Sequence, residues 1–161
     1  MELMPRIQRI LEDPAFMDHV SANARAEATR IFCRHDLVHF LDVCRVARIM
    51  ELETGLDLGV ETVYAAGLLH DIGRWQEVAT GIDHALASAE LAVPILKRCG
   101  FTREETGHIS EAIAAHRTRD HPSELARILY EADKASRMCL FCDARGQCKR
   151  FRHGETFQFL R

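Results

Sequence analysis

The stretch VETVYAAGLLHDIG, residues 60–73, decides the fold that we expect for this chain. Apolar and small residues fill it almost without interruption up to Leu69, which is typical of a helix buried on all sides. Gly73 follows in the position where a glycine commonly ends a helix. We therefore predict a central helix over residues 60–72, with His70 and Asp71 near its end.

Helical patterns also precede and follow this segment. Some stretches are rich in helix-forming residues, and others place apolar side chains three and four positions apart. They predict helices over residues 22–33, 36–53, 84–99, about 102–116 and about 124–138. We expect Pro94 to kink or divide the third of these helices, and Thr102 and Ser123 to cap the last two.

The expected fold class is all-α. No stretch of strict alternation is long enough to predict a sheet, although residues 157–160 offer a short strand at most. We expect one compact domain built as a bundle of five to seven helices. Its helical core would span residues 1–138, with the polar motifs inside 34–137, and a cysteine-containing extension over 139–161 would pack on it.

Composition and charge limit the classes of function. The chain has 161 residues, enough for one domain with a real core, and its formal net charge is −3. This balance gives no electrostatic reason to expect nucleic acid or a membrane as the main partner. No apolar run approaches the roughly 20 residues of a membrane span, and the first residues lack a secretory signal, so we expect a cytoplasmic protein.

Histidine is frequent, with nine in the chain. Several histidines and aspartates fall on or beside the apolar faces of five successive predicted helices. They are His39, His70, Asp71, His84, His116 and Asp133. A buried histidine or carboxylate needs a partner, because its desolvation is otherwise costly. These groups would satisfy one another most easily around metal ions, for which histidine is the commonest ligand.

Adjacent His70 and Asp71 set a geometric condition on such a site. Neighbouring side chains point about 100° apart on a helix, so one ion engages both only near a helix end. Gly73 permits the local unwinding that this requires. We expect the metal site at the end of the central helix.

The run AGLLHDIG at residues 66–73 resembles the central motif of the HD-domain metal-dependent phosphohydrolases. The run HFLDVCRVA at 39–47 resembles the first histidine motif of this superfamily, and ADK at 132–134 resembles its closing aspartate. The resemblance covers roughly residues 34–137, with the motifs in the family's order. The arrangement also resembles small bacterial HD hydrolases that split dinucleoside polyphosphates.

The resemblance implies an all-helical domain that holds one or two divalent ions. His84 and His116 are similar to the extra histidines of the two-metal branch, although Arg117 follows His116 where that branch often has a second histidine. The implied ligands are His39, His70, Asp71 and Asp133 for the first ion, and His84, His116 and a bridging Asp71 for the second. Such ligands favour iron, manganese, zinc or cobalt over magnesium.

The implied reaction is hydrolysis of a phosphomonoester or phosphoanhydride, with a nucleotide or another small phosphorylated metabolite as substrate. Water activated by metal would attack phosphorus at a catalytic centre built on His70 and Asp71. Arg74 replaces the lysine of the frequent HDIGK sequence and is the expected phosphate contact. Weaker candidates for that contact are Arg34, Arg117 and Lys134.

Two other functions fit the same scaffold. A metal- or nucleotide-sensing module without catalysis is one alternative, which the full set of six ligands argues against. Oxygenase chemistry at a di-iron centre, as relatives of the scaffold imply, is the other. The sequence leaves the oligomeric state open.

For the remaining histidines, the sequence indicates no partner side chain. His35 lies four residues before His39 and can share its helix face, but we expect a surface or capping role for it. His19, His108 and His121 are expected at the surface.

A second cluster of possible ligands lies near the C-terminal end. Cys139, Cys142 and Cys148 have C-x2-C-x5-C spacing, and His153 comes five residues later. This is close to the ligand set of a structural zinc site, which would brace the helix that carries Asp133. Half-buried thiols in a loop are one alternative, and an iron–sulfur role, which would need a fourth ligand, is another. The other cysteines are expected to pack between helices: Cys33, Cys44 and Cys99.

Overall fold

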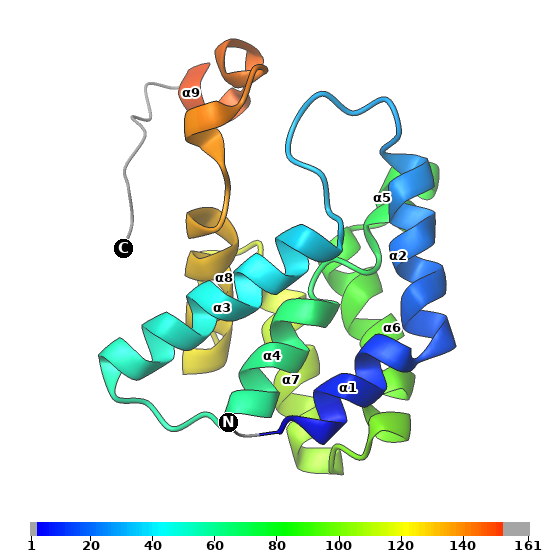
Figure 1. Cartoon of the computed structure of the whole chain (residues 1–161), viewed down its shortest axis with the longest axis vertical. Helices are drawn as coiled ribbons and strands as arrows, with labels where there is room; N and C mark the ends of the chain where they lie inside the picture. The colour runs from blue at the N-terminus through cyan, green and yellow to red at the C-terminus, as the bar shows by residue number, and fades with distance from the viewer. Residues whose placement is uncertain (1–2, 153–161) are drawn as a thin grey trace.

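The computed structural model describes residues 3–152, and α-helices dominate it (Figure 1). The body consists of α1 (Pro5–Glu12), α2 (Pro14–Ala26), α3 (Leu37–Thr54), α4 (Val60–Leu69), α5 (Arg74–Thr80), α6 (His84–Cys99), α7 (Arg103–Ala115) and α8 (Glu124–Ala135). Two 3-10 turns, η1 (Cys139–Phe141) and η2 (Arg145–Gln147), and the short helix α9 (Lys149–Arg152) follow. Residues 3–152 contain no strand, so the all-α prediction is confirmed.

Helix α4 lies at the centre of the bundle, as its apolar sequence predicted. Its buried residues are Val63 and the run from Ala65 to Leu69. Helix α3 packs along it so closely that a Cβ on Gly67 would lie 2.6 Å from Sγ of Cys44. Helices α1, α6, α7 and α8 also contact α4. A helix with apolar groups on every side is stable only when neighbours cover it in this way.

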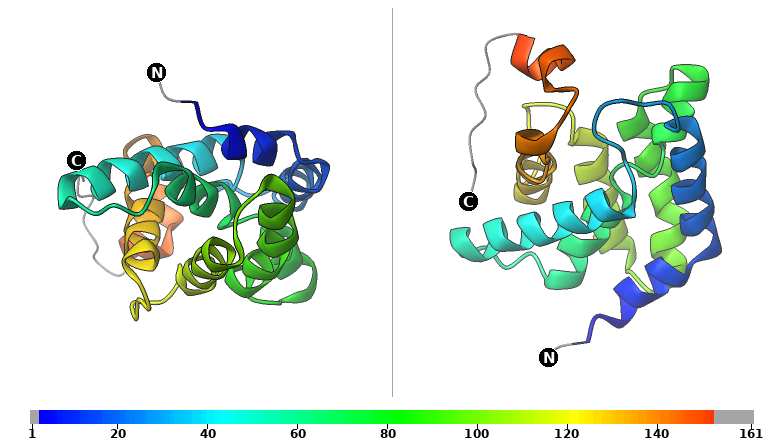
Figure 2. Two further views of the ribbon diagram at one scale, coloured as in Figure 1. Left: turned by 90° about the horizontal axis from the view of Figure 1, so that it is seen from below. Right: turned by 45° about the horizontal axis from the view of Figure 1, so that its top comes forward.

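The other helices surround α4 on both sides (Figures 1 and 2). Helices α1, α2, α5 and α6 form one side, where α2 packs on α5 and α1 packs on α6. Helix α8 packs against α3 and α7 on the other side. Within the described residues, no helix is long and apolar enough to cross a bilayer.

Most predicted helices are confirmed, together with their caps. Thr102 and Glu105 bond reciprocally to each other's backbone N–H groups, and the Ser123 hydroxyl accepts from the N–H of Ala126. Pro94 lies inside α6, which nevertheless runs unbroken over Ala92 and beyond to its C-terminal end. Of the two expected effects of Pro94, the division of the helix is therefore wrong, and a kink stays a prediction.

The predicted helix over residues 22–33 is also wrong. Helix α2 starts earlier, at Pro14, because the Asp13 carboxylate caps its first turn, and it ends at Ala26. A loop over residues 27–36 follows, in which the carboxylate of Glu27 accepts a hydrogen bond from the N–H of His35 at 2.9 Å. This long-range bond overrides the local helix propensity.

Further boundaries differ from the sequence prediction. Helix α4 ends at Leu69, three residues before the predicted end, and helices α1 and α5 were not predicted. The expected strand at 157–160 lies outside the described residues. The division of the chain at residue 138 stays a prediction.

Candidate metal centre

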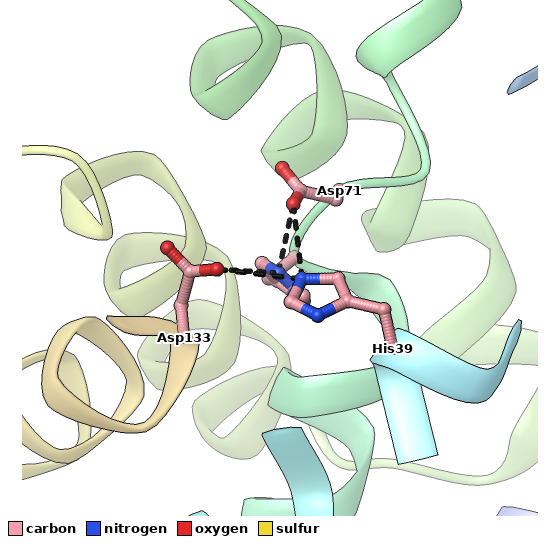
Figure 3. Close-up of side chains that lie close together, drawn as sticks. His39, Asp71 and Asp133 are labelled. Atoms are coloured by element: carbon pink, nitrogen blue, oxygen red, sulfur yellow. Dashed lines mark ion pairs between the residues drawn. The ribbon is translucent and has the colours of Figure 1, made fainter. Parts of the chain in front are cut away.

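Six side chains from separate parts of the bundle converge beside the end of α4. His39 comes from the first turn of α3, Asp71 from the turn after α4, and Asp133 from α8, and they point toward one another (Figure 3). Two sets of donor atoms each lie within 4.8 Å of one another: His39, His70, Asp71 and Asp133 in one, and Asp71, His84 and His116 in the other. The structure thus brings together all six histidines and aspartates that the sequence predicted as ligands of the first and second ions.

Asp71 belongs to both sets, and its two carboxylate oxygens face different histidines. Oδ2 lies 2.9 Å from Nε2 of His70 and 3.8 Å from Nε2 of His39. Oδ1 lies 3.0 Å from Nε2 of His84 and 3.3 Å from Nε2 of His116. A carboxylate with one oxygen toward each set has the geometry of a bridging ligand.

Backbone carbonyls orient two of the histidines. Nδ1 of His70 lies 2.7 Å from the Gly67 carbonyl oxygen, and Nδ1 of His116 lies 2.6 Å from that of Ile113. A carbonyl only accepts, so each Nδ1 carries the proton and each Nε2 presents its lone pair to the centre. Metal-ligating histidines are commonly fixed in this way.

The turn that carries His70 and Asp71 is held by contacts from α2 and α6. Asn23 Nδ2 donates to the Asp71 carbonyl at 2.8 Å, and Gly73 N–H donates to the Ser88 hydroxyl at 2.9 Å. Gly73 has φ −89°, an ordinary value for any residue. Position 73 requires a glycine because there is no room for a side chain: a Cβ there would lie 2.6 Å from the backbone nitrogen of Ser88.

The electrostatics favour anionic carboxylates at the centre. Burial alone would raise the pKa of Asp71, but the surrounding histidines, His70 first, hold it well below its usual range. Burial also opposes the charged form of Asp133, yet its bond to His39 and the charge of Arg137 keep its pKa low as well. Burial lowers the pKa of His39, but Asp133 and Asp71 outweigh this and raise it to about 9.

Several donor atoms at this centre are buried without a hydrogen-bond partner. They include Nε2 of His39, Nε2 of His70 and Oδ1 of Asp71. Unpaired buried polar atoms cost free energy, and native structures rarely keep several of them together. A divalent cation would satisfy all three, so the residues present fit the metal that the sequence predicted.

Asp133 is anchored by Arg137, which lies just after the end of α8. Nη2 of Arg137 donates to both carboxylate oxygens of Asp133 at 3.0 and 2.9 Å, and Lys134 also pairs with this carboxylate. These bonds leave Oδ1 facing Nε2 of His39 at 3.3 Å. The sequence analysis did not single out Arg137, although an arginine four residues after a predicted ligand aspartate indicates that the two side chains can pair.

Arg74 lies beside the second set of ligands. Its guanidinium bonds to Glu27 at 3.1 Å and to Glu77, and it lies 3.2 Å from Nδ1 of His84. Glu77 also contacts that Nδ1. This placement favours a role in orienting His84, and the expected contact between Arg74 and a phosphate stays a prediction. Glu27 and Glu77 were not foreseen.

His35 is not at the surface, so the expected surface or capping role is wrong. It is buried, and Asp36 caps α3 instead. Nδ1 of His35 lies 2.7 Å from Oε1 of Glu27, and Nε2 lies 3.7 Å from Oδ2 of Asp71. His35 lies before the start of α3, so the pattern of helix faces did not predict its burial.

The remaining histidines are partly as expected. His108 is exposed, whereas His19 is half-buried against Trp75 and His121 is half-buried against Tyr130, so the surface prediction is wrong for these two. His153 lies outside the described residues.

The comparison with protein families agrees with the geometry. The model of the HD domain matches residues 37–138, which is most of the chain and includes all six ligands. The chain belongs to the HD domain family. This assignment confirms the resemblance to the HD-domain metal-dependent phosphohydrolases.

Similar proteins extend over most of this HD chain. An uncharacterized protein of Clostridium beijerinckii is 37% identical over 90% of this chain and 92% of its own length. The crystal structure of a predicted HD superfamily hydrolase from an uncultured Thermotogales bacterium matches with a TM-score of 0.58 and 29% identity, over 90% of this chain and 79% of that one.

A more distant similarity concerns part of a larger protein. Ribonuclease Y of Desulforamulus reducens is 32% identical over 62% of this chain. The HD chain described here spans only 17% of the length of that relative. The match therefore concerns one segment of ribonuclease Y.

Proposed function

We propose that this HD protein is a metal-dependent phosphohydrolase that cleaves a phosphomonoester or phosphoanhydride, with a nucleotide or a related small metabolite as substrate. The observation that carries the proposal is the position of Asp71 between two sets of buried ligands. Two-metal sites of this kind suit hydrolysis, because they can serve both the attacking and the leaving oxygen.

Divalent ions at this centre would supply an activated water and would neutralise charge that develops on the phosphoryl group. We propose iron, manganese, zinc or cobalt, since imidazole and carboxylate are the donors. The chain itself supplies the orientation: Gly67 and Ile113 carbonyls fix the rings of His70 and His116, and Arg137 fixes Asp133.

A pocket beside the first set of ligands offers a place for an anionic substrate. Its volume is about 440 Å³, and His39, Arg34 and Arg137 are among its lining residues. Arg34 is the guanidinium that would meet phosphate oxygens there, because Arg137 is already bonded to Asp133. Asp36, Asp42 and Asp143 also line this pocket, so metal ions would have to offset their charge. A larger pocket of about 670 Å³ lies around Arg6 and His108, and we do not place the substrate there because it contains none of the ligand cluster.

The similarity to ribonuclease Y makes phosphodiesters the second candidate substrate class. The similarity covers 62% of this chain at 32% identity. The net charge of −3 argues against a long nucleic acid, which needs several phosphate contacts from basic side chains. A short diester or a dinucleotide would avoid this requirement.

A panel of substrates tests the proposal. Protein reconstituted with manganese or, without oxygen, with ferrous iron is assayed on p-nitrophenyl phosphate, bis-p-nitrophenyl phosphate, nucleoside phosphates, dinucleoside polyphosphates and a single-stranded RNA. We expect metal-dependent release of phosphate or nucleotide that Asp71→Asn abolishes, whereas the exposed control His108→Ala keeps it.

The other outcomes separate the alternatives. Diester cleavage alone would replace the proposed substrate class by phosphodiesters. Nucleotide binding without turnover at any metal loading would favour the sensing module. Consumption of oxygen with an oxidised product would favour di-iron oxygenase chemistry.

A further inference from the structure

Four cysteines lie on two segments that are far apart in the sequence but next to each other in space. Cys33 is in the loop over residues 27–36, and the other three follow α8. In Figures 1 and 2 this loop and the segment after α8 stand next to each other above the helical body. The pocket of about 440 Å³ is lined by Cys33 on one side and by Met138 and Cys142 on the other.

Consecutive turns fold the C-terminal cysteines back toward Cys33. Cys142 N–H donates to the Cys139 carbonyl, and Arg145 and Cys148 continue the chain of turns through bonds of 3.1 Å each. Burial raises the pKa of the Cys139 thiol, and the nearby Cys33 and Cys148 sulfur atoms raise it further. Cys139 thus lies near both Cys33 and Cys148.

The segment that holds these turns has almost no hydrophobic core. Met138, Leu140 and Phe141 are exposed, and the side chains buried there are Cys139 and Ala144. All six cysteines of the chain are free, so no disulfide holds the segment. A short irregular segment without a core usually depends on a covalent or metal crosslink for its order.

We propose that Cys33, Cys139, Cys142 and Cys148 form a metal centre with four thiolate ligands. Cys33 supplies the fourth ligand that the spacing of the C-terminal motif does not, and it replaces the sequence-based candidate His153. The site is separate from the HD centre, and its existence does not depend on the proposed hydrolysis.

Among the described residues, no set of three thiols lies as close together as a single zinc ion requires, so we favour an iron–sulfur cluster. Tetrahedral zinc, with Zn–S bonds of about 2.3 Å, draws sulfur atoms to roughly 4 Å from one another. Among the described residues, the sets of three or more donor atoms that lie within 4.8 Å of one another are the two at the HD centre. An iron–sulfur cluster places several iron atoms between the cysteines and accepts a wider arrangement.

The centre would join two segments that carry HD ligands. Cys33 lies six residues before His39, and Cys139 lies six residues after Asp133. A crosslink there fixes the loop before α3 to the end of α8, on the two sides of the pocket that His39 lines. We therefore expect loss of the centre to loosen this pocket.

The test uses the full chain purified without oxygen. Iron, acid-labile sulfide and zinc are measured, and X-ray absorption separates sulfur ligands from the nitrogen and oxygen ligands of the HD centre. We expect a sulfur-ligated metal in the wild type. Cys33→Ser and Cys142→Ser should lose it, whereas His153→Ala and the control Cys99→Ser should keep it.

Each outcome bears on the proposal. Labile sulfide supports the iron–sulfur form, and sulfur-ligated zinc that depends on Cys33 supports the same four-thiolate site with a single ion. Metal that survives Cys33→Ser but is lost in His153→Ala would overturn the assignment of the fourth ligand. Absence of any sulfur-ligated metal would overturn the proposal.

A second measurement covers the possibility that the variants do not fold. In the wild type, alkylation by iodoacetamide is mapped before and after treatment with a chelator and a mild oxidant. Protection of Cys33, Cys142 and Cys148 that ends with this treatment supports the centre. Equal alkylation of these three half-buried thiols before and after treatment contradicts it.

Discussion

The side chain of Asn23, on α2, donates from Nδ2 to the backbone carbonyl oxygen of Asp71 at 2.8 Å. Its Oδ1 accepts a hydrogen bond from the N–H of Trp75 at the same distance. Asn23 is fully buried, so these two bonds fix the turn between α4 and α5 from outside the HD motif. A helix that contributes no ligand thus determines where the bridging carboxylate lies.

Asn23→Ala should therefore destabilise the protein and weaken metal binding. The substitution removes one of the two hydrogen bonds to the Asp71 carbonyl, which also accepts from the Arg74 N–H at 3.1 Å, and leaves the Trp75 N–H without this partner. The loss costs about 1–3 kcal/mol of unfolding free energy. Urea unfolding and metal titration measure the two effects. Ser21→Ala, at an exposed position of the same helix, is the control, and equal behaviour of the two variants would contradict the role of Asn23.

Gly73→Ala should destabilise the fold through overpacking. The new Cβ would meet backbone of α6 at 2.6 Å and 2.9 Å and would push that helix, which carries His84, away from Asp71. The expected cost is about 1–3 kcal/mol, with weaker binding of the second ion. Gly107→Ala in α7 has open space around its Cβ and should be neutral or slightly stabilising. Similar thermal unfolding of both variants would rule out this packing argument.

Metal binding should release protons at neutral pH. In the metal-free protein, Asp133 and Asp71 raise the pKa of His39 to about 9 against the effect of burial, so the ring is protonated at pH 7. A histidine must be neutral to ligate a metal, so the ion displaces that proton. The apparent affinity should therefore rise with pH up to about 9.

Calorimetric titration in two buffers of different ionisation enthalpy measures this release. At pH 7.5 we expect at least one proton per bound ion of the first set. A binding enthalpy that is the same in both buffers would show that His39 is already neutral.

Glu27 should contribute an acid-sensitive part of the stability. Burial raises its pKa, but the bonds from His35 and Arg74 dominate and lower it from 4.5 to about 2. A carboxyl group whose pKa is lower in the folded than in the unfolded state stabilises the fold fully above its unfolded pKa of 4.5. This contribution disappears as the pH falls toward the folded pKa of about 2. At 1.36 kcal/mol per unit, the shift corresponds to at most about 3 kcal/mol.

Glu27→Gln should remove this pH dependence and lower the stability at pH 7. Urea midpoints of metal-free protein between pH 2 and pH 7 measure it, because ligand protonation would otherwise add its own effect. The exposed Glu53→Gln is the control. An unchanged slope in Glu27→Gln would mean that the carboxylate is not held as described.

The fold and the ligands were predictable where the pattern is local and periodic. The apolar run up to Leu69 predicts the central helix, and His39, His84 and His116 follow helical patterns around it. Residues 27–33 were mispredicted as helix, because the bonds of Glu27 outweigh helix propensity there. Asn23 and His35 were missed for a related reason, since their roles depend on contacts between segments that no spacing in the sequence encodes. Arg137 was missed although it lies four residues after Asp133, a spacing that the sequence does show.

The bridging position of Asp71 is the central claim, and anomalous X-ray scattering from crystals loaded with manganese tests it most directly. We predict two peaks about 3.5–4 Å apart, the first among His39, His70, Asp71 and Asp133, and the second among Asp71, His84 and His116. Peaks elsewhere, or ions that Asp71 does not contact, would contradict the account.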